Sequence, residues 1–455
     1  MNSLAPRDAT MYWLSARTRN DLFLLYCFAD TGRSVARLRA ELAARVARIP
    51  DLLVHVLDTP ANIAYPIWVD CEFITDQFID HELPDATWTD VTSALGDLLG
   101  TGVRAAHRPW RVHIFRGITG APGFAPGEPA LVVVLQLSHA LADGRRAAAL
   151  ARCLFTQPAG TEPAPPRDRS FAEILRTGTG AAGWMAAAAA LPALPIDMAR
   201  TVIRGLAAHR AEQRLAELAA TGAVPPPAPG APPNLLNGGG SSPSAHAVRV
   251  LVHDAEALRV PGHTVTVVAA TAISLALQRY LAQRGEPTEE TAEPLLAQIP
   301  MAVAGAGKTR NSYCDLSVDL AVHEPALPRR ATLIAAELAI RRERAVHPLQ
   351  EARSRVADAM PARLLHGDVT HYPIEHLPER VSGHTVLSSV HRGPADLSFG
   401  GGVVRFTSGF PGLGSVMHLT HGVHGLGDTV TVSVHADPAV LPDLDQYAEM
   451  LNKAL

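Results

Sequence analysis

The chain has 455 residues, more than one hydrophobic core of about 250–300 residues can organise, so we expect two domains or subdomains. Hydrophobic residues make up 47% of the sequence, charged residues 18%, and the formal net charge is −4 at pH 7. This composition excludes a disordered chain and a strongly basic nucleic-acid binder, so we expect a globular protein with no nucleic-acid partner.

The first apolar stretch, residues 22–28, does not have the pattern of a signal peptide. Asp21 and Asp30 bracket it, and no small-residue cleavage site follows. The four cysteines lie far apart without a C-x-x-C pair, which indicates neither a disulfide framework nor a cysteine zinc site. We therefore expect a reduced, cytoplasmic setting. The cysteines are Cys27, Cys71, Cys153 and Cys314.

Residues 1–155, the predicted N-terminal subdomain, mix helical and strand patterns. Apolar residues recur at helical spacing between Ser34 and Ile49, which predicts a helix there. The run from Leu131 to Leu137 is apolar except for Gln136, as is typical of a strand buried on both faces. A helical pattern returns between Arg145 and Phe155, so the order is strand, short loop, helix.

Residues 156–245 form a predicted connector, because two proline-rich stretches and a Gly/Ser cluster cannot hold regular structure. Within it, Thr177 to Ile196 is uncharged and long enough to cross a bilayer. Two prolines near its end favour a buried or interfacial helix over a span. In the following helix, Met198 to Ala220, four arginines share an arc of about 120° that could face anionic lipid. Leucine and isoleucine share that arc too, so we favour a solvated face.

Residues 246–455, the predicted C-terminal subdomain, again alternate strands and helices. We expect a helix from Thr264 to Gln283, a strand from Leu295 to Val303 and a helix from Arg329 to Arg344. The stretch from Thr385 to Val434 is rich in β-branched residues and glycine, and a helix from Leu441 to Ala454 follows. The whole chain is therefore predicted to be two α/β halves around a connector.

One segment resembles a phosphate-binding loop but lacks the required context. Ala302 to Thr309 (AVAGAGKT) matches G-x-x-x-x-G-K-[ST] except for its first glycine. A phosphate loop must open a helix whose N-terminal amides bind the anion, whereas Arg310 to Leu320 alternates like a strand. We therefore predict a polar turn between two strands.

The histidine series near the C-terminus is also an unconvincing site. Its H-x-x-H-x-x-H spacing lacks the i, i+4 geometry of a helical zinc site, and no carboxylate lies between the histidines, so we expect no metal. A G-x-S-x-G motif is absent, which argues against an α/β-hydrolase. The series consists of His418, His421 and His424, with His435 beyond.

The segment from Ser138 to Gly144 (SHALADG) carries the most promising chemistry. His139 leaves an almost fully apolar strand where the chain turns, which can expose an imidazole while keeping its surroundings dry. A histidine without a nearby nucleophile suits direct general-base catalysis, in which neutral imidazole takes the proton of an attacking hydroxyl. The alternative is a histidine and Asp143 paired within a purely structural loop.

This segment resembles the H-H-x-x-x-D-G signature of acyltransferases with the chloramphenicol-acetyltransferase-like condensation fold, and specifically the bacterial wax ester synthase/diacylglycerol acyltransferase family. The resemblance covers nearly the whole chain, and the long helix from Thr264 to Leu281 matches one in the family. Further similar segments are Pro6 to Met11, Pro66 to Asp70, Arg108 to Trp110, Leu236 to Gly238, Ile299-Pro300 with Asn311, and Ala436 to Val440 with Pro442-Asp443.

The resemblance implies two acetyltransferase-like subdomains with an active-site tunnel at their interface, reached by acyl-CoA from one side and by a hydroxyl acceptor from the other. His139 would be the base. Asp143 would orient the loop through a buried ion pair with an arginine, and Gly144 would permit tight packing. Acyl-CoA would be a substrate, with diacylglycerol or a long-chain alcohol as acceptor, and the activated thioester needs no metal or other cofactor.

Three departures from the family pattern leave the substrates open. Ser138 replaces the first histidine of the signature, and we expect its side chain to point away from the reacting atoms because residues alternate along a strand. Arg310 replaces the glycine before Asn311, and Leu387 to Pro394 replaces S-N-V-P-G-P. A different hydroxyl or amine acceptor, a carrier-protein thioester donor, and a catalytically silent lipid-binding protein therefore remain alternatives. Peripheral association with the inner membrane face or with lipid droplets is also an open expectation.

Overall fold

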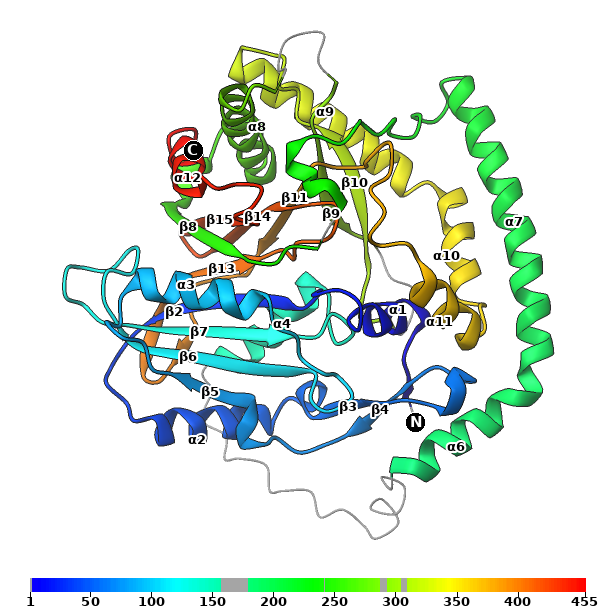
Figure 1. Cartoon of the computed structure of the whole chain (residues 1–455), viewed down its shortest axis with the longest axis horizontal. Coiled ribbons are helices and arrows are strands. Elements are labelled where there is room, and N and C mark those ends of the chain that lie inside the picture. The colour runs from blue at the N-terminus through cyan, green and yellow to red at the C-terminus, as the bar shows by residue number, and fades with distance from the viewer. Residues whose placement is uncertain (1, 157–178, 241, 287–292, 304–308) are drawn as a thin grey trace.

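The structure is a computed structural model, and it describes residues 2–156, 179–240, 242–286, 293–303 and 309–455. Two six-stranded sheets form its framework (Figure 1). The first, which we call the N-terminal sheet, has the order β12-β13-β2-β7-β6-β5. Its strands are β12 (Ser398–Phe399), β13 (Gly402–Phe410), β2 (Leu22–Ala29), β7 (Ala130–Leu137), β6 (Trp110–Ile118) and β5 (Phe78–His81).

The strand β7 lies inside this sheet, as its apolar run predicts. All eight of its residues are buried, and it pairs antiparallel with β2 on one side and β6 on the other. One face packs on α2 (Val35–Val46) and α4 (Gly144–Phe155), and the other packs on α3 (Trp88–Leu99). The predicted strand, loop and helix around residues 131–155 are confirmed. A small antiparallel sheet of β1 (Asn2–Ser3), β4 (Ile67–Asp70) and β3 (Val54–Leu57) lies near α1 (Pro6–Leu14).

The second sheet, the C-terminal sheet, has the order β10-β9-β11-β14-β15-β8. Its core forms against α8 (Val265–Gln283), α9 (Leu327–Ala345) and α12 (Leu444–Asn452), which confirms the three helices expected in this part. Two shorter helices, α10 (Glu351–Ala357) and α11 (Ala362–His371), follow α9. The strands are β10 (Tyr313–Asp319), β9 (Leu296–Ala302), β11 (Thr385–His391), β14 (Leu419–Leu426), β15 (Thr429–Ala436) and β8 (Ala247–Asp254).

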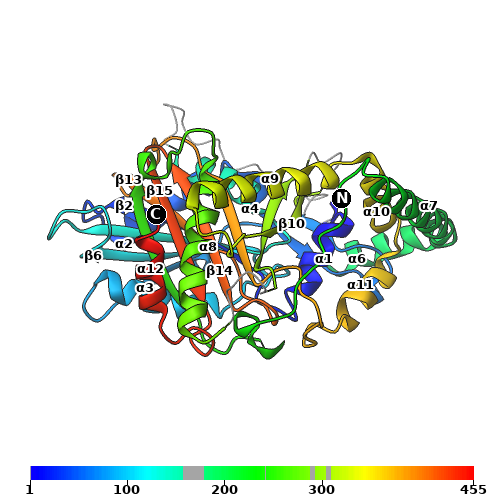
Figure 2. The same ribbon diagram turned by 90° about the horizontal axis from the view of Figure 1, so that it is seen from above.

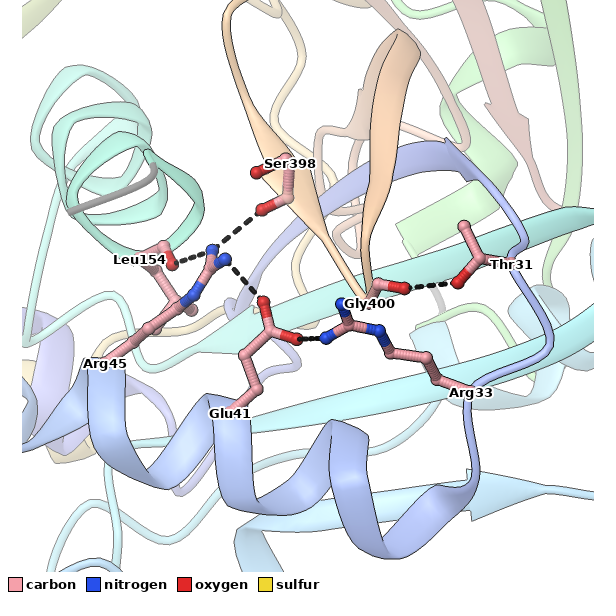
Figure 3. Close-up of polar contacts among 7 residues, drawn as sticks. All are labelled: Thr31, Arg33, Glu41, Arg45, Leu154, Ser398 and Gly400. Atoms are coloured by element: carbon pink, nitrogen blue, oxygen red, sulfur yellow. Dashed lines mark hydrogen bonds and ion pairs between the residues drawn. The ribbon is translucent and has the colours of Figure 1, made fainter. Parts of the chain in front are cut away.

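The hairpin β12–β13 comes from the C-terminal half of the chain but belongs to the N-terminal sheet, where β13 pairs with β2. Figure 3 shows how α2 holds it: Arg45 donates to the carbonyls of Ser398 (2.7 Å) and Leu154 (2.9 Å). Glu41 accepts from Arg45 and is paired with Arg33 at 3.2 Å. The two subdomains are therefore interlocked. The division at residues 155 and 246 stays a prediction, and it divides the sequence into segments without marking a border between the two sheets.

The connector contains α6 (Thr179–Ala190) and α7 (Leu194–Ala220), separated by a single 3-10 turn that includes Pro192. Both views place α7 at one end of the molecule, away from the N-terminal sheet (Figures 1 and 2). Its two buried residues are Ala211 and Leu215. The break at the prolines is confirmed. Of the two alternatives expected for this stretch, a buried helix is wrong, because most of its large apolar side chains are exposed, and an interfacial helix stays a prediction.

The region of the phosphate-loop resemblance is extended on both sides. The strands β9 and β10 pair antiparallel, with Ala302 opposite Tyr313 at one end and Leu296 opposite Asp319 at the other, as the alternating pattern predicts. Residues 304–308, which contain most of the resemblance, lie outside the described residues. The strand after it, in place of a helix, removes the context that phosphate binding requires.

Candidate active site

His139 lies two residues beyond the end of β7, at the edge where the chain turns toward α4. The residue before it, Ser138, donates its N–H to the carbonyl of Pro109 at 2.7 Å, and Trp110 pairs with Leu137. The strand end is therefore fixed by β6, and the chain reverses through a turn in which the N–H of Leu141 donates to the Ser138 carbonyl at 2.9 Å. A rigid strand and a tight turn together position the imidazole.

Asn311 fixes the orientation and tautomer of the His139 ring. Its Oδ1 lies 2.8 Å from His139 Nδ1, while its Nδ2 donates to Asp8 (2.9 Å) and to the His139 carbonyl (2.9 Å). Since Nδ2 has two acceptors, the amide oxygen must face the ring and accept a hydrogen from Nδ1. The second ring nitrogen, Nε2, then carries the lone pair, and no hydrogen bond from the described residues occupies it.

Asp8, near the start of the chain, holds Asn311 in place. It is almost fully buried, and its oxygens also accept from the backbone N–H of Arg310 (2.9 and 3.0 Å) and from Thr309 Oγ1 (2.9 Å). Burial raises the pKa of this carboxyl, against the lowering effect of those hydrogen bonds. The α1 helix and the loop before β10 thus form a second layer behind His139.

Burial also lowers the pKa of His139 from its ordinary value, with the bonds from its own backbone and Asn311 and the charges of Asp143 and Asp8 acting in the opposite direction. The imidazole is consequently neutral at pH 7. A neutral ring with Nδ1–H held by an amide and Nε2 unoccupied is the form that a general base requires.

Asp143 does not form the buried ion pair that we expected. One of its oxygens accepts from the N–H of Arg146 (2.9 Å) as the N-cap of α4, and the other accepts from the N–H of Ser312 (2.9 Å). Its own N–H donates to the Arg310 carbonyl at 3.1 Å. The side chain is buried against backbone amides, and these already satisfy a carboxylate. Asp143 therefore ties α4 to the loop before β10.

Gly144 and Ser138 differ in how well they match their expected roles. A Cβ atom at Gly144 would lie 3.7 Å from Val390 Cγ2, an ordinary contact, so the packing around this position leaves room for alanine, and the expected role of Gly144 stays a prediction. Ser138 is fully buried, and its Oγ accepts from the N–H of Ala140 at 3.3 Å. The half-buried His139 reaches Asn311 instead, as alternation along the strand end predicts.

The histidines of the C-terminal sheet are buried structural groups. His421 lies 2.9 Å from Thr385 Oγ1 and 2.6 Å from the Tyr447 hydroxyl, and His435 lies 2.8 Å from the Pro411 carbonyl and 2.9 Å from His246. His418 pairs with Asp437 at 2.9 Å. Among the described residues, no group of three or more potential metal ligands comes together.

The expected tunnel at His139 stays a prediction. Two of the cavities between the described residues have volumes of about 760 and 580 Å³, and neither is lined by His139. The larger lies beside Trp13, Asp21 and His366, and the smaller lies under α6, next to Tyr65. Asn311 and Asp8 both lie in segments that resemble the family, and that resemblance is the sequence signal that could have identified them as site residues. The sequence alone did not show that they hold His139.

Comparisons with known proteins agree with this architecture. Residues 4–248 match the model of the wax ester synthase/diacylglycerol acyltransferase catalytic domain, which is more than half of the chain. Two Mycobacterium tuberculosis proteins whose names carry a provisional diacylglycerol O-acyltransferase assignment, MT1809 and Rv1760, are each 26% identical over 454 residues. Those alignments cover 93% of this chain and 82% of each relative.

Solved structures show the same fold. The wax ester synthase/diacylglycerol acyltransferase from Marinobacter aquaeolei VT8 superposes with a TM-score of 0.63 at 17% identity, covering 100% of this chain and 98% of that one. The starter condensation domain of rhizomide synthetase, solved with C8-CoA and Leu-SNAC, gives 0.55 at 14% identity, covering 100% and 94%. The predicted α/β fold of two acetyltransferase-like subdomains is confirmed. The chain belongs to the wax ester synthase/diacylglycerol acyltransferase family.

Proposed function

We propose that the protein is an O-acyltransferase that moves a fatty acyl group from acyl-CoA to the hydroxyl of diacylglycerol or of a long-chain alcohol, with His139 as the general base. The observation that carries the proposal is the orientation of His139: Asn311 holds Nδ1–H at 2.8 Å, which leaves the neutral Nε2 as the proton acceptor. Asp143 is the positioning residue that joins α4 to the Arg310–Ser312 loop.

The reaction needs one group that both accepts and returns a proton. Nε2 takes the hydroxyl proton while the acceptor oxygen forms a bond to the thioester carbonyl carbon. When the carbon–sulfur bond breaks, the CoA thiolate takes that proton from the imidazolium, so the products are an ester and free CoA, and His139 is neutral again. The thioester is already activated, so the proposal uses no cofactor beyond acyl-CoA as a substrate.

The donor has better support than the acceptor. The family match supports acyl transfer, and the related condensation domain was solved with C8-CoA. The departures at Arg310 and in the 387–394 segment leave the acceptor as the open part of the proposal. The second candidate is a condensation-fold acyltransferase with a carrier-protein thioester or an amine acceptor, which the condensation-domain likeness favours.

The test is CoA release from palmitoyl-CoA, followed with a thiol-trapping reagent and mass analysis of the product. Hexadecanol, diacylglycerol and hexadecylamine serve as acceptors, and the reaction without acceptor gives the hydrolysis background. We expect acceptor-dependent release with a hydroxyl acceptor and formation of the ester. Release with the amine alone would favour the second candidate, and no release with any acceptor would favour a silent lipid-binding protein.

We also propose that the protein works in the cytoplasm at a lipid surface, the inner membrane face or a lipid droplet, with α6 and α7 as its contact. Several large apolar side chains on these helices, among them Trp184, Met198 and Val202, are 45–66% exposed. On α7, Met198, Val202 and Leu206 share one stripe at i, i+4 and i+8. Arg204 and Thr201 instead donate to carbonyls of the protein body. The second stretch apolar enough for a span, α8, is mostly buried.

Sedimentation with vesicles of phosphatidylglycerol and phosphatidylcholine tests this contact. Val202→Glu should weaken binding about tenfold, because it places a charge on the apolar stripe. Val403→Glu is the matched control, since Val202 and Val403 are 59% and 58% exposed. Equal vesicle binding by the native protein and Val202→Glu would contradict the proposed contact.

A further inference from the structure

Three charged residues meet beside His139, from three separate elements. Asp51 lies on the 3-10 turn Pro50–Leu52, Arg146 on the first turn of α4, and Arg310 just before β10. One oxygen of Asp51 lies 2.7 Å from Arg146 Nη2, and the other lies 3.1 Å from Arg310 Nη2. The Arg310 guanidinium also lies over the Trp68 ring, 4.6 Å from its centre. A single carboxylate thus serves two guanidinium groups.

The backbone of this cluster is part of the catalytic arrangement. The Arg310 carbonyl accepts from the N–H of Asp143, and its N–H donates to Asp8. Arg310 directly precedes Asn311, and Arg146 is the residue whose N–H Asp143 caps. A ligand group at the two guanidiniums would therefore bind next to the residues that position His139.

The cluster in Figure 3 likewise joins one carboxylate to two guanidinium groups, but its hydrogen bonds are complete. There Glu41 serves Arg33 and Arg45, and the remaining Nη1 of Arg45 donates to two backbone carbonyls. In the cluster beside His139, Arg310 Nη1 and Arg146 Nε are buried and have no hydrogen-bond partner among the described residues. Buried N–H groups of a cation nearly always have an acceptor, so the second cluster lacks one.

The neighbouring carboxylates do not supply that acceptor. Asp8 is engaged with Thr309, Asn311 and the Arg310 backbone, and Asp143 with two backbone amides. The cluster remains accessible from outside, because the side chains of Asp51, Arg146 and Arg310 are 40%, 37% and 14% exposed. Two guanidiniums that share one carboxylate favour a second anionic partner.

We propose that Arg310 and Arg146, held by Asp51, form an anion subsite that binds a phosphate or carboxylate group of a substrate while that substrate reaches His139. The inference rests on the proposed acyl transfer and adds a substrate class to it. Arg310 stands where the family pattern that this sequence resembles has glycine. The anion comes from one of two sources: the phosphates of the CoA donor, or an acidic group carried by the hydroxyl acceptor.

Direct binding isolates the subsite from catalysis. Calorimetric titration with inorganic pyrophosphate, CoA, dephospho-CoA and pantetheine compares the native protein with Arg310→Gln. The matched control is Arg249→Gln, which removes a half-exposed arginine paired with Asp445 on the surface of β8. If the donor supplies the anion, Arg310→Gln weakens pyrophosphate and CoA about tenfold or more and leaves pantetheine unchanged, whereas Arg249→Gln changes none of them.

A second experiment tests whether the acceptor supplies the anion. It uses palmitoyl-CoA with two acceptors, hexadecanol and 16-hydroxyhexadecanoate, of which only the second carries a carboxylate. If the acceptor supplies the anion, Arg310→Gln lowers the ratio of kcat/KM for the hydroxy acid to kcat/KM for hexadecanol about tenfold. The proposal is overturned if pyrophosphate binding, CoA binding and the ratio of the two acceptors are all unchanged in a variant with the native melting temperature. A native protein that binds pyrophosphate through Arg310 but releases no CoA would refute the acyl transfer and leave the subsite standing.

Discussion

His139 is half-buried and His421 is fully buried, and their surroundings differ further. His421 lies within β14, and both of its ring nitrogens are occupied, one by Thr385 and the other by Tyr447. His139 lies beyond a strand end, with one nitrogen held by Asn311 and the other unoccupied among the described residues. Burial lowers the pKa of both, so a perturbed pKa alone does not locate the site. His418, which Asp437 orients, also has an unused nitrogen, but that atom is buried. The site is located by an oriented ring whose unused nitrogen is not buried.

The largest expected effect on stability concerns the buried structural histidines at acid pH. Burial lowers the pKa of His435 to about 3, whereas the unfolded chain has the ordinary value near 6.5. Below pH 6.5 the unfolded state takes up a proton that the folded state refuses, so stability falls as pH drops toward 3. At pH 5 this amounts to about 2 kcal/mol.

Urea unfolding at pH 7.5 and pH 5 measures this contribution. In His435→Gln, whose amide does not titrate, the fall in stability between the two pH values should be smaller by about 2 kcal/mol. An equal fall in the native protein and the variant would show that His435 titrates normally in the folded state.

A second prediction separates orientation of the ring from its mere presence. Asn311→Ala removes the acceptor for Nδ1–H and should lower turnover by about 10²-fold through misplacement of His139. Asn311→Asp keeps an acceptor and adds a negative charge, so it should retain more activity and move the acid limb of the pH–rate profile to higher pH. Identical pH profiles for the native protein and Asn311→Asp would argue against contact with a titrating base.

Asp143 should behave as a link in the backbone framework. Asp143→Ala removes the N-cap of α4 and the acceptor for Ser312, which should cost about 1–2 kcal/mol of stability in urea unfolding. Asp443→Ala is the control, because Asp443 occupies the N-cap of α12 without a capping bond. Loss of activity in Asp143→Ala with unchanged stability would instead indicate a direct proton-transfer role.

The smallest effect is expected at Gly144. An alanine there makes an ordinary contact with Val390, so Gly144→Ala should change the free energy of unfolding by no more than about 0.5 kcal/mol. A loss above about 2 kcal/mol in the same urea experiment would support the idea that this loop needs glycine for packing.

The sequence predicted those parts of the molecule that depend on local pattern. The apolar run of β7, the helical spacing of α2, α4 and α8, and the turn at Asp143 are properties of neighbouring residues. Asn311 meets His139 across 172 residues and meets Asp8 across 303, and no periodicity reports such distances. The same holds for the β12–β13 hairpin, which joins the N-terminal sheet from the other half of the chain.

The partner of Asp143 could not be predicted for a related reason. An aspartate before a helix has two ways to satisfy its charge, a guanidinium or a set of backbone amides. The choice depends on where the loop before β10 passes, and that loop is set by the docking of the C-terminal sheet. The separation of His139 from the other buried histidines likewise depends on which ring nitrogens find partners.

The central claim is that this chain is an active acyltransferase whose base is His139, and one measurement tests it most directly. CoA release from palmitoyl-CoA with the best acceptor is compared for the native protein, His139→Ala and His323→Ala, an exposed control. We predict that His139→Ala lowers turnover by roughly 10²–10⁴-fold with an unchanged melting temperature, while His323→Ala stays near the native rate. Near-native turnover by His139→Ala would contradict the account.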